Sequence, residues 1–443
     1  MRRILLLFAF AFSALAADEA ARLDSFIARY HQLGLFNGSA LVADHGVPVL
    51  KKGYGLANME WNIPNAADTK FRLGSITKQF TAALVLQMVE QGKLDLSAPI
   101  ARYLPDYPRA TGDRITIHQL LNHTSGIPGY TELPQFGSIM RDPKRPQEFM
   151  KIFSGLELLF EPGTKFSYNN SAFFVLGAIL EKLTGQTYEQ LLRERIFDPA
   201  GMKNSGYDST HPLLSKRAAG YDATLEGYRN TTYIDMTQPF SAGSLYSTVE
   251  DLYLWDQALY GDRILKPAGK EKMFTPGLSS YGYGVYIRKA AVTTIEHGGG
   301  INGFNTHFIR FPGERLAVAV FSNVNGPAAD TLAMSLARLY FGEDVKGREK
   351  FTGITLSEAE LEAFAGTYEL APTFSIKVKR EGAQLIAQAT NQPAFSVTPY
   401  AANKFFVKVV DAQLEFTRNA EGKVESLILH QGGRSMPGKR VGD

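Results

Sequence analysis

The feature that most constrains this chain is a serine followed three residues later by a lysine, at the start of a core-facing helix. Ser75 and Lys78 lie in the stretch 71–80, FRLGSITKQF. Residues three apart share a helix face, so the hydroxyl and the amine should meet. Residues 79–91 are apolar at helical spacing and stop at Gly92, which predicts a helix packed into a core. The pair is therefore a nucleophile beside a base, at a helix end whose free N–H groups can bind an oxyanion.

The pair alone is weak evidence. At background usage of about one lysine in twenty residues, a chain with this many serines should contain about one Ser-x-x-Lys by chance. No other serine in this chain has a lysine three residues on, but a surface lysine on an ordinary helix is the competing interpretation. Further motifs must decide between the two.

Length, charge and composition exclude several classes of protein. At 443 residues the chain exceeds one typical core, so we expect a large domain and a smaller one. The 47 basic and 44 acidic residues nearly balance, which gives no strong field for nucleic acid. There are no cysteines, so disulfides and thiol chemistry are excluded. The histidines show no metal-binding pattern, and we interpret His118 and His123 as framework residues.

The first sixteen residues have the pattern of a secretory signal peptide. A basic start at Arg2 and Arg3 precedes an apolar run and small residues at Ala14 and Ala16. The run is shorter than the roughly 20 residues that span a bilayer, and no other stretch is long enough. We therefore expect export to the periplasm or the medium, a mature chain from about Ala17, and no transmembrane segment after cleavage.

Residues 17–350 are expected to form one α/β domain. Helical spacing or strand alternation predicts a helix at 18–33, two strands within 38–55, a helix at 171–183, strands at 281–287, 305–311 and 316–322, and a helix at 328–340. The middle third mixes helices with Pro- and Gly-rich connections. Terminal strands joined in one sheet, around a helical middle, make an α/β sandwich.

A change of pattern near residues 347–355 marks a domain boundary. Residues 351–443 are mostly short alternating runs, at 374–379, 384–388, 405–410, 413–417 and 424–430. Turn residues separate these runs, which predicts a small β-barrel or sandwich.

A second motif lies at the end of the stretch 161–170, where Tyr168 and Asn170 occupy a turn that leads into a helix. Beside a lysine ammonium, the Tyr168 phenol could act as a phenolate base and later as an acid. Asn170 could hydrogen-bond a substrate amide. Tyr228 and Asn230 share this spacing, but the Pro-Gly turn and the helix around Tyr168 would hold its side chain more rigidly.

A third motif is a strand that runs into glycines, IEHGGGINGF at 295–304. Backbone without β-carbons can pair with an extended substrate and supply an N–H group to an oxyanion. His297 can donate or accept near neutral pH. His430 and Gly432 have the same spacing, so a His-x-Gly match alone is weak evidence for a functional site.

The three motifs together, in this order, resemble those of the penicillin-recognising serine hydrolases: class C β-lactamases, DD-peptidases, D-aminopeptidases and related esterases. Framework segments at 120–128, 160–164, 241–252 and 311–313 are similar too, so the resemblance covers roughly residues 23–340. It implies a β-lactamase/DD-peptidase-like α/β sandwich, an antiparallel sheet flanked by helices with an additional helical region.

The resemblance also implies roles for individual residues. Ser75 would be the acylated nucleophile, Lys78 its activating partner, Tyr168 the proton shuttle and Asn170 the substrate ligand. His297, Gly298 and Gly299 would form the third motif and contact substrate, and the N–H groups of Ser75 and Gly300 would form the oxyanion hole. No metal or cofactor is implied. We interpret Tyr130 as a pocket wall and the loop 130–146 as a candidate lid.

One departure from class C β-lactamases shapes the functional hypothesis. The third motif has His297 where those enzymes have lysine, which removes a fixed charge and weakens the case for β-lactam hydrolysis. We expect an exported serine hydrolase acting on a small amide or ester, foremost a D-amino-acid-containing peptide. An esterase or weak β-lactamase, and a penicillin-binding receptor with little turnover, are the alternatives. The C-terminal domain would be lipocalin-like; its role, the natural substrate and the oligomeric state stay open.

Overall fold

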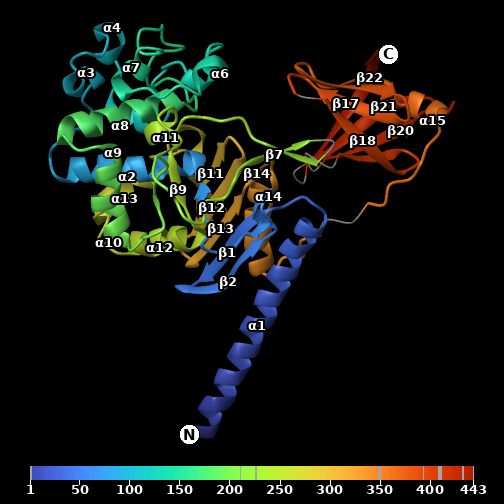
Figure 1. Cartoon of the computed structure of the whole chain (residues 1–443), viewed down its shortest axis with the longest axis horizontal. Helices are drawn as coiled ribbons and strands as arrows, with labels where there is room; N and C mark the ends of the chain where they lie inside the picture. Colours follow the sequence, from blue (N-terminus) through green and yellow to red (C-terminus); the bar gives the residue numbers. More distant parts are fainter. Residues whose placement is uncertain are drawn as a thin grey trace.

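An antiparallel six-stranded sheet organises the larger part of the molecule (Figure 1). Its strand order is β10-β11-β12-β13-β1-β2, with bounds Tyr286–Lys289, Thr293–Ile301, Phe304–Phe311, Leu316–Ser322, Gly38–Asp44 and Val47–Tyr54. Strand β1 pairs antiparallel with β13 along its whole length. The first and last strands of the domain are therefore neighbours, which confirms the α/β sandwich predicted from the sequence.

The computed structural model describes residues 2–209, 211–224, 227–347, 351–392, 394–407, 412–431 and 434–442, with side chains from residue 17 on except residue 434. The predicted signal peptide, residues 1–16, lies outside the part whose side chains are described. Residues 348–350 of the predicted domain boundary are outside it as well. Over the described residues, no helix combines the length and the apolar character needed to cross a membrane.

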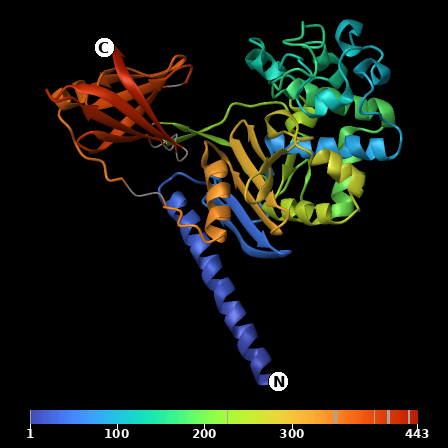
Figure 2. The same ribbon diagram turned by 180° about the vertical axis from the view of Figure 1, so that it is seen from behind.

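Helices cover both faces of the sheet. On one face lie α1 (Arg2–Gln32) and α14 (Ala328–Tyr340), which pack on a core that includes Val42, Val318 and Leu332 (Figure 2). On the other face lies α12 (Val249–Tyr260), and α2 (Thr77–Glu90) shares the apolar core on that side with Leu41 and Ala317. Twelve residues of α2 are buried, more than one stripe of a surface helix provides, because α2 also supports the helical region on its far side.

The helical region fills the middle of the chain. Its central helix is α8 (Asn170–Thr184), whose residues from Ser171 to Leu180 are all buried. Near it lie α3 (Ile100–Tyr103), α4 (Arg109–Gly112), α5 (Ile117–Leu121), α6 (Phe136–Ile139), α7 (Pro146–Met150), α9 (Tyr188–Leu192) and α11 (Phe240–Gly243). In contrast, α13 (Pro267–Met273) packs on α2, and α10 (Asp198–Ala200) contacts α12. Helix α8 contacts both α2 and α11, so the start of α8 and the start of α2 come together.

In the part of the chain that the structure describes, three small sheets lie outside the six-stranded sheet and the helical region. β9 (Leu245–Ser247) lies between β5 (Phe71–Arg72) and β6 (Gly206–Tyr207). β14 (Val324–Asn325) pairs with the hairpin β7 (Tyr221–Thr224) and β8 (Gly227–Asn230), and β3 (Leu56–Asn58) pairs with β4 (Ile63–Pro64). The short 3₁₀ turn η1 (Gly74–Ile76) follows β5 and leads directly into α2.

The C-terminal domain is a closed barrel of eight strands, which settles the sequence-based alternative of barrel or sandwich. Strands β15–β22 span Gly366–Ala371, Phe374–Glu381, Gln384–Ala389, Ala394–Ala401, Lys404–Val407, Ala412–Arg418, Val424–Gln431 and Arg434–Gly442. The helix α15 (Glu358–Glu362) packs against β16 and β17. Figure 1 shows the barrel to one side of the α/β domain.

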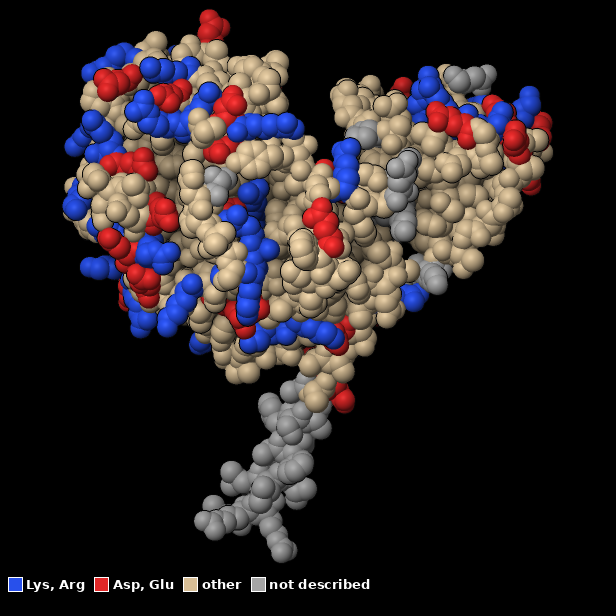
Figure 3. Space-filling model, viewed as in Figure 1, with Lys and Arg blue, Asp and Glu red and all other residues tan. Residues whose placement is uncertain are grey.

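Three barrel strands have no counterpart among the predicted runs. β18 contains Pro399, and β22 contains Pro437 and Gly438 between basic residues, so neither shows a clean apolar alternation. The predicted run 405–410 ends in residues 408–410, outside the described part. In Figure 3 acidic and basic side chains are interspersed on the left part of the α/β domain and at the outer end of the barrel, with uncharged surface between them.

Candidate active site

Ser75 is held where the small sheet meets α2. Leu73 N–H donates to the Leu245 carbonyl (2.7 Å), which ties the chain before Ser75 to β9. Between Leu73 and Phe80, Ser75 is the one residue that is not buried. The helix that follows is core-facing, as the sequence pattern predicts. The serine hydroxyl is therefore reachable from outside while its backbone is fixed.

Lys78 is completely buried and contacts three oxygen atoms. Its Nζ lies 2.9 Å from Ser75 Oγ, 2.8 Å from Asn170 Oδ1 and 3.0 Å from the Ala242 carbonyl oxygen. Burial holds the pKa of Lys78 well below its ordinary value. A neutral amine has two N–H donors and one lone pair, and the two carbonyl oxygens can only accept. The lone pair is therefore available to the Ser75 hydroxyl, which suits Lys78 to accept the serine proton.

Asn170 is the first residue of α8, and both ends of its amide are oriented. Its Oδ1 accepts from Lys78, and its Nδ2 donates to Thr131 Oγ1 (3.2 Å). The side chain of Asn169 caps the same helix by accepting from Ala172 N–H (2.8 Å). Asn170 therefore presents an N–H group next to the nucleophile, where it can bind a substrate carbonyl.

Tyr168 lies against the amine of Lys78, with 4.8 Å between Nζ and the ring centroid. Burial raises the pKa of its phenol, and the nearby Ser75 hydroxyl lowers it, with the net shift upward. No hydrogen bond of good geometry joins the two hydroxyls, and the Tyr168 hydroxyl has no partner among the described residues. A protonated phenol at neutral pH is expected, rather than the phenolate proposed from the sequence. Tyr228, the competing tyrosine, is exposed and donates to the Gly34 carbonyl instead.

His297 is buried on β11, and both of its ring nitrogens are engaged. Nδ1 donates to the Gly298 carbonyl (2.5 Å) and Nε2 accepts from the Tyr281 hydroxyl (3.1 Å). Burial lowers the pKa of His297 to about 3. The third motif therefore carries a neutral imidazole at physiological pH and supplies no positive charge.

The glycines of β11 let that strand approach the nucleophile at backbone contact. A β-carbon on Gly299 would lie 1.9 Å from the Leu73 carbonyl oxygen, and one on Gly74 would lie 2.9 Å from the Gly300 nitrogen. A β-carbon on Gly298 would face the opposite side of the sheet, 3.1 Å from Asp330 Oδ1. This contact brings the Gly300 nitrogen beside the Ser75 turn, as the predicted oxyanion hole requires.

One edge of β11 is open next to the site. β10 pairs with β11 only as far as the pair Tyr286 and Glu296. Gly284, with φ 73°, turns the preceding chain away and packs against the Lys78 backbone. Among the described residues, no strand pairs with residues 297–301 on that side. An extended substrate can therefore pair with this edge.

Tyr130 does not line an open surface, which corrects its assignment as a pocket wall. Its ring is 2 % exposed and packs against an aromatic cluster of Phe136, Phe149, Phe153 and Phe174. The adjacent Thr131 is exposed and contacts Asn170 instead. Thr131 could not be predicted as a site residue, because a lone threonine in a loop carries no sequence signal.

The loop 130–146 is anchored, so it is not a free lid. We call residues 231–239 the bridging segment, and it makes three hydrogen bonds with the loop. They join Asp235 N–H to the Met140 carbonyl (2.9 Å), Lys144 N–H to Thr237 Oγ1 (3.0 Å), and Gln238 Nε2 to the Asp142 carbonyl (2.5 Å). At its other end, the Thr232 carbonyl accepts from Asn302 in the β11–β12 turn (2.7 Å). The bridging segment therefore connects the third motif to the loop.

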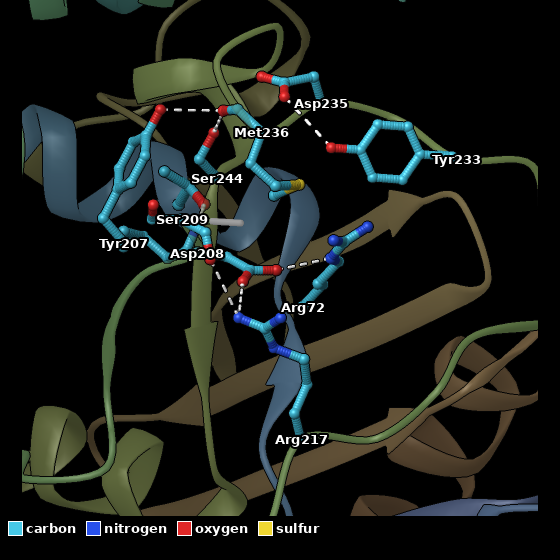
Figure 4. Close-up of polar contacts among 11 residues, drawn as sticks. Arg72, Tyr207, Asp208, Ser209, Arg217, Tyr233, Asp235, Met236 and Ser244 are labelled. Carbon is cyan, nitrogen blue, oxygen red and sulfur yellow. Dashed lines mark hydrogen bonds and ion pairs between the residues drawn. The ribbon is translucent and has the colours of Figure 1, made fainter. Parts of the chain in front are cut away.

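A buried ion cluster supports β5 (Figure 4). Asp208, whose side chain is 1 % exposed, accepts from Arg72 Nε and Arg217 Nη2, both at 2.6 Å. Its N–H donates to the Ser244 carbonyl (2.8 Å), two residues from the Ala242 carbonyl that binds Lys78. Asp208 therefore ties together the two segments that hold the nucleophile and its base.

A sheet and a helical region with a serine, a buried lysine and a tyrosine at their junction define a serine hydrolase of the acyl-enzyme type. The family model described as Beta-lactamase matches residues 20–342, and the chain belongs to that family. A second family model, described as Domain of unknown function (DUF3471), matches residues 352–440.

Three similar proteins illustrate the range of this family. The Bacillus subtilis protein PbpX is 36% identical over 296 residues, covering 66% of this chain and 72% of PbpX. Esterase EstB of Burkholderia gladioli is 38% identical over 218 residues, covering 46% of this chain and 55% of EstB. The structure of D-amino acid amidase from Ochrobactrum anthropi is similar with a TM-score of 0.59 and 27% identity, covering 69% of this chain and 90% of the amidase.

Proposed function

We propose that the protein is an exported hydrolase that forms an acyl-enzyme on Ser75 and hydrolyses small amides or esters of D-amino acids or D-amino-acid-containing peptides. The contact of the neutral Lys78 amine with Ser75 Oγ carries the proposal. Ser75 attacks the substrate carbonyl while its proton passes to Lys78. The oxyanion is stabilised by the N–H groups of Ser75 and Gly300.

Tyr168 completes the acylation step as a proton donor. Its phenol gives a proton to the departing alcohol or amine, and the Lys78 ammonium returns one to the phenolate, so the neutral pair is restored. Water then attacks the ester on Ser75 and gives its proton to Lys78. The resulting ammonium protonates Ser75 Oγ as the acid product leaves, which restores the free serine and the neutral lysine. Each step is balanced without a cofactor.

The neutral third motif favours a substrate without a carboxylate beside the scissile bond. The stretch 295–304 contains no lysine or arginine, and His297 is held neutral. Peptides that end in a carboxylate after the scissile bond, and β-lactams, would lack their counter-charge at this motif. Amides and esters with an uncharged leaving group need none, and the similarity to a D-amino acid amidase supports this substrate class.

A simple esterase is the second candidate, supported by the similarity to EstB. An ester requires less protonation of its leaving group than an amide does. Comparing D- and L-phenylalanine amides with p-nitrophenyl butyrate would separate the two candidates. D-selective amide turnover supports the first, and ester turnover without amide turnover supports the second.

Labelling at Ser75 tests the proposal directly. Intact mass would be measured after incubation with a serine-directed phosphonate and with penicillin, for the wild type and for Ser75→Ala. We expect a phosphonate adduct that requires Ser75. No Ser75-dependent adduct with either reagent would refute the hydrolase, whereas a lasting penicillin adduct without turnover would indicate a penicillin-binding receptor.

Export is a separate part of the proposal, supported by the pattern of residues 1–16. The basic start and apolar run support cleavage near Ala17. The N-terminus of the protein recovered from the periplasm or medium of an expressing bacterium should be Ala17 or a near neighbour. An uncleaved chain confined to the cytoplasm would contradict this part of the proposal.

A further inference from the structure

His123 contacts the segment that carries Tyr168, although the reaction steps above do not use it. It is fully buried and lies just after α5. Its carbonyl oxygen accepts from Ser167 N–H (2.9 Å), and its ring Nδ1 accepts from Asn169 N–H (3.1 Å). One residue therefore holds the backbone on both sides of Tyr168.

The backbone of His123 is in an unfavourable conformation for a histidine. Its φ is 60°, in the left-handed region, where a β-carbon crowds the following carbonyl oxygen. Glycine or asparagine would adopt this conformation more easily. The imidazole compensates with the Nδ1 bond and with ring packing, since the His123 and Tyr168 centroids are 4.4 Å apart.

The hydrogen bonds also define the state of the His123 ring. A nitrogen that accepts from an N–H group bears no proton, so the proton of the neutral ring is on Nε2. Burial holds the pKa of His123 well below its ordinary value. Nε2 has no hydrogen-bond partner among the described residues, and it belongs to a cluster in which Tyr281 is 4.6 Å away by ring centroids. The neutral ring adds no charge that would compete with Lys78.

We propose that His123 is a positioning residue for Tyr168: it fixes the phenol in the orientation from which the hydroxyl protonates the leaving group. The inference rests on the proposed function, in which Tyr168 is the proton donor. His123 acts through Tyr168 and touches neither Ser75 nor Lys78 by hydrogen bond. Its loss should therefore matter only for substrates whose leaving group needs a proton.

Two esters of one acid separate this role from a general structural one. The p-nitrophenolate of p-nitrophenyl butyrate departs as an anion, whereas the alcohol of ethyl butyrate must be protonated. His123→Gly accepts the left-handed backbone but removes the ring. We expect kcat for ethyl butyrate to fall about 10²-fold, and for p-nitrophenyl butyrate less than about threefold.

Further variants sharpen the test. His123→Asn keeps an acceptor near the position of Nδ1 and should restore most of the ethyl butyrate activity. Tyr168→Phe should show the same dependence on the leaving group, and combining it with His123→Gly should cost little more. His118→Asn is the matched control, because His118 bonds Tyr283 and Asn122 instead, and it should leave the ratio of the two activities unchanged.

Two results would overturn the inference: an equal fall with both esters in His123→Gly, or full additivity with Tyr168→Phe. Absence of a Ser75-dependent adduct in the wild type would instead refute the proposed function. If His123→Gly does not fold, nitrogen NMR of labelled histidine in the wild type decides. A proton on Nε2 from about pH 5 to pH 9 supports the assignment, and a proton on Nδ1 overturns it.

Discussion

Replacing Gly299 with alanine should disable the site by moving a strand. The new β-carbon would lie 1.9 Å from the Leu73 carbonyl oxygen, and real β-carbons essentially never approach closer than 3.0 Å. The strand β11 and the turn that carries Ser75 must therefore separate by about 1.1 Å. An oxyanion hydrogen bond of about 2.9 Å would lengthen to about 4 Å, which is no longer a hydrogen bond.

Loss of one oxyanion donor lowers kcat by about 10²–10³. We expect a fall of this size for Gly299→Ala, measured as the acylation burst and steady-state hydrolysis of p-nitrophenyl butyrate. Overpacking should also cost about 1–3 kcal/mol of unfolding free energy, seen in thermal and denaturant unfolding. The β-carbon would also lie 2.5 Å from Thr306 Oγ1, but its closest contact is with the Leu73 backbone, so no side-chain rearrangement can relieve it.

Gly298→Ala is the matched control on the same strand. Its β-carbon would meet Asp330 Oδ1 at 3.1 Å, the end of a side chain that can move, on the face away from Ser75. We expect less than a tenfold loss of activity. A folded Gly299→Ala enzyme within about threefold of the wild type would refute the reasoning, since β11 would then not hold the oxyanion donor.

Three further predictions concern proton transfer, stability and domain organisation. Tyr168→Phe should lower turnover of amides by roughly 10²-fold or more with unchanged circular dichroism; normal turnover would mean that another group donates the proton. Burial lowers the pKa of His307, but hydrogen bonds and charges from Asp330 and Glu296 outweigh it and raise this pKa from 6.5 to about 9. Burial raises the pKa of Glu296, but hydrogen bonds and charges from His307 and Arg288 outweigh it and lower this pKa from 4.5 to about 2. The contribution of the His307–Glu296 pair to the free energy of unfolding should therefore be complete between pH 4.5 and 6.5, and be lost as pH rises through 9 or falls through 2. Urea titrations of the wild type and of His307→Gln would measure it. A variant whose stability parallels that of the wild type at every pH would contradict this prediction. Removal of residues from 351 on should leave a folded Ser75-reactive domain, judged by phosphonate labelling, and an insoluble product would place the boundary elsewhere.

The chemistry of the site was more predictable than its electrostatics. Spacing alone placed Ser75 and Lys78 on one helix face, because the geometry of a helix is local. The state of Tyr168 depends on burial by segments far away in the chain, and no local pattern reports it. The phenolate expected from the sequence therefore became a protonated phenol in the structure.

Support residues were harder to predict than reacting residues. His123 follows a short helix and has no signal for its left-handed backbone, and Asp208 meets Arg72 across 136 residues of sequence. Tyr130 is aromatic in a loop near the site, a pattern as typical of a pocket wall as of a core. Only tertiary packing distinguishes these cases. The same holds in the barrel, where closure of the sheet accommodates β18 and β22 despite their prolines.

The short β10 affects what the enzyme can discriminate. A peptide laid along residues 297–301 would occupy the ladder positions that β10 leaves empty, so main-chain groups common to all amino acids would provide the attraction. The pleat then fixes the side of the sheet toward which each substituent projects. Inverting the configuration of an α-carbon exchanges the directions of its side chain and its hydrogen, whereas replacing one side chain by another leaves these directions unchanged. We expect the open edge of β11 to select the handedness of a substrate residue more strictly than the identity of its side chain.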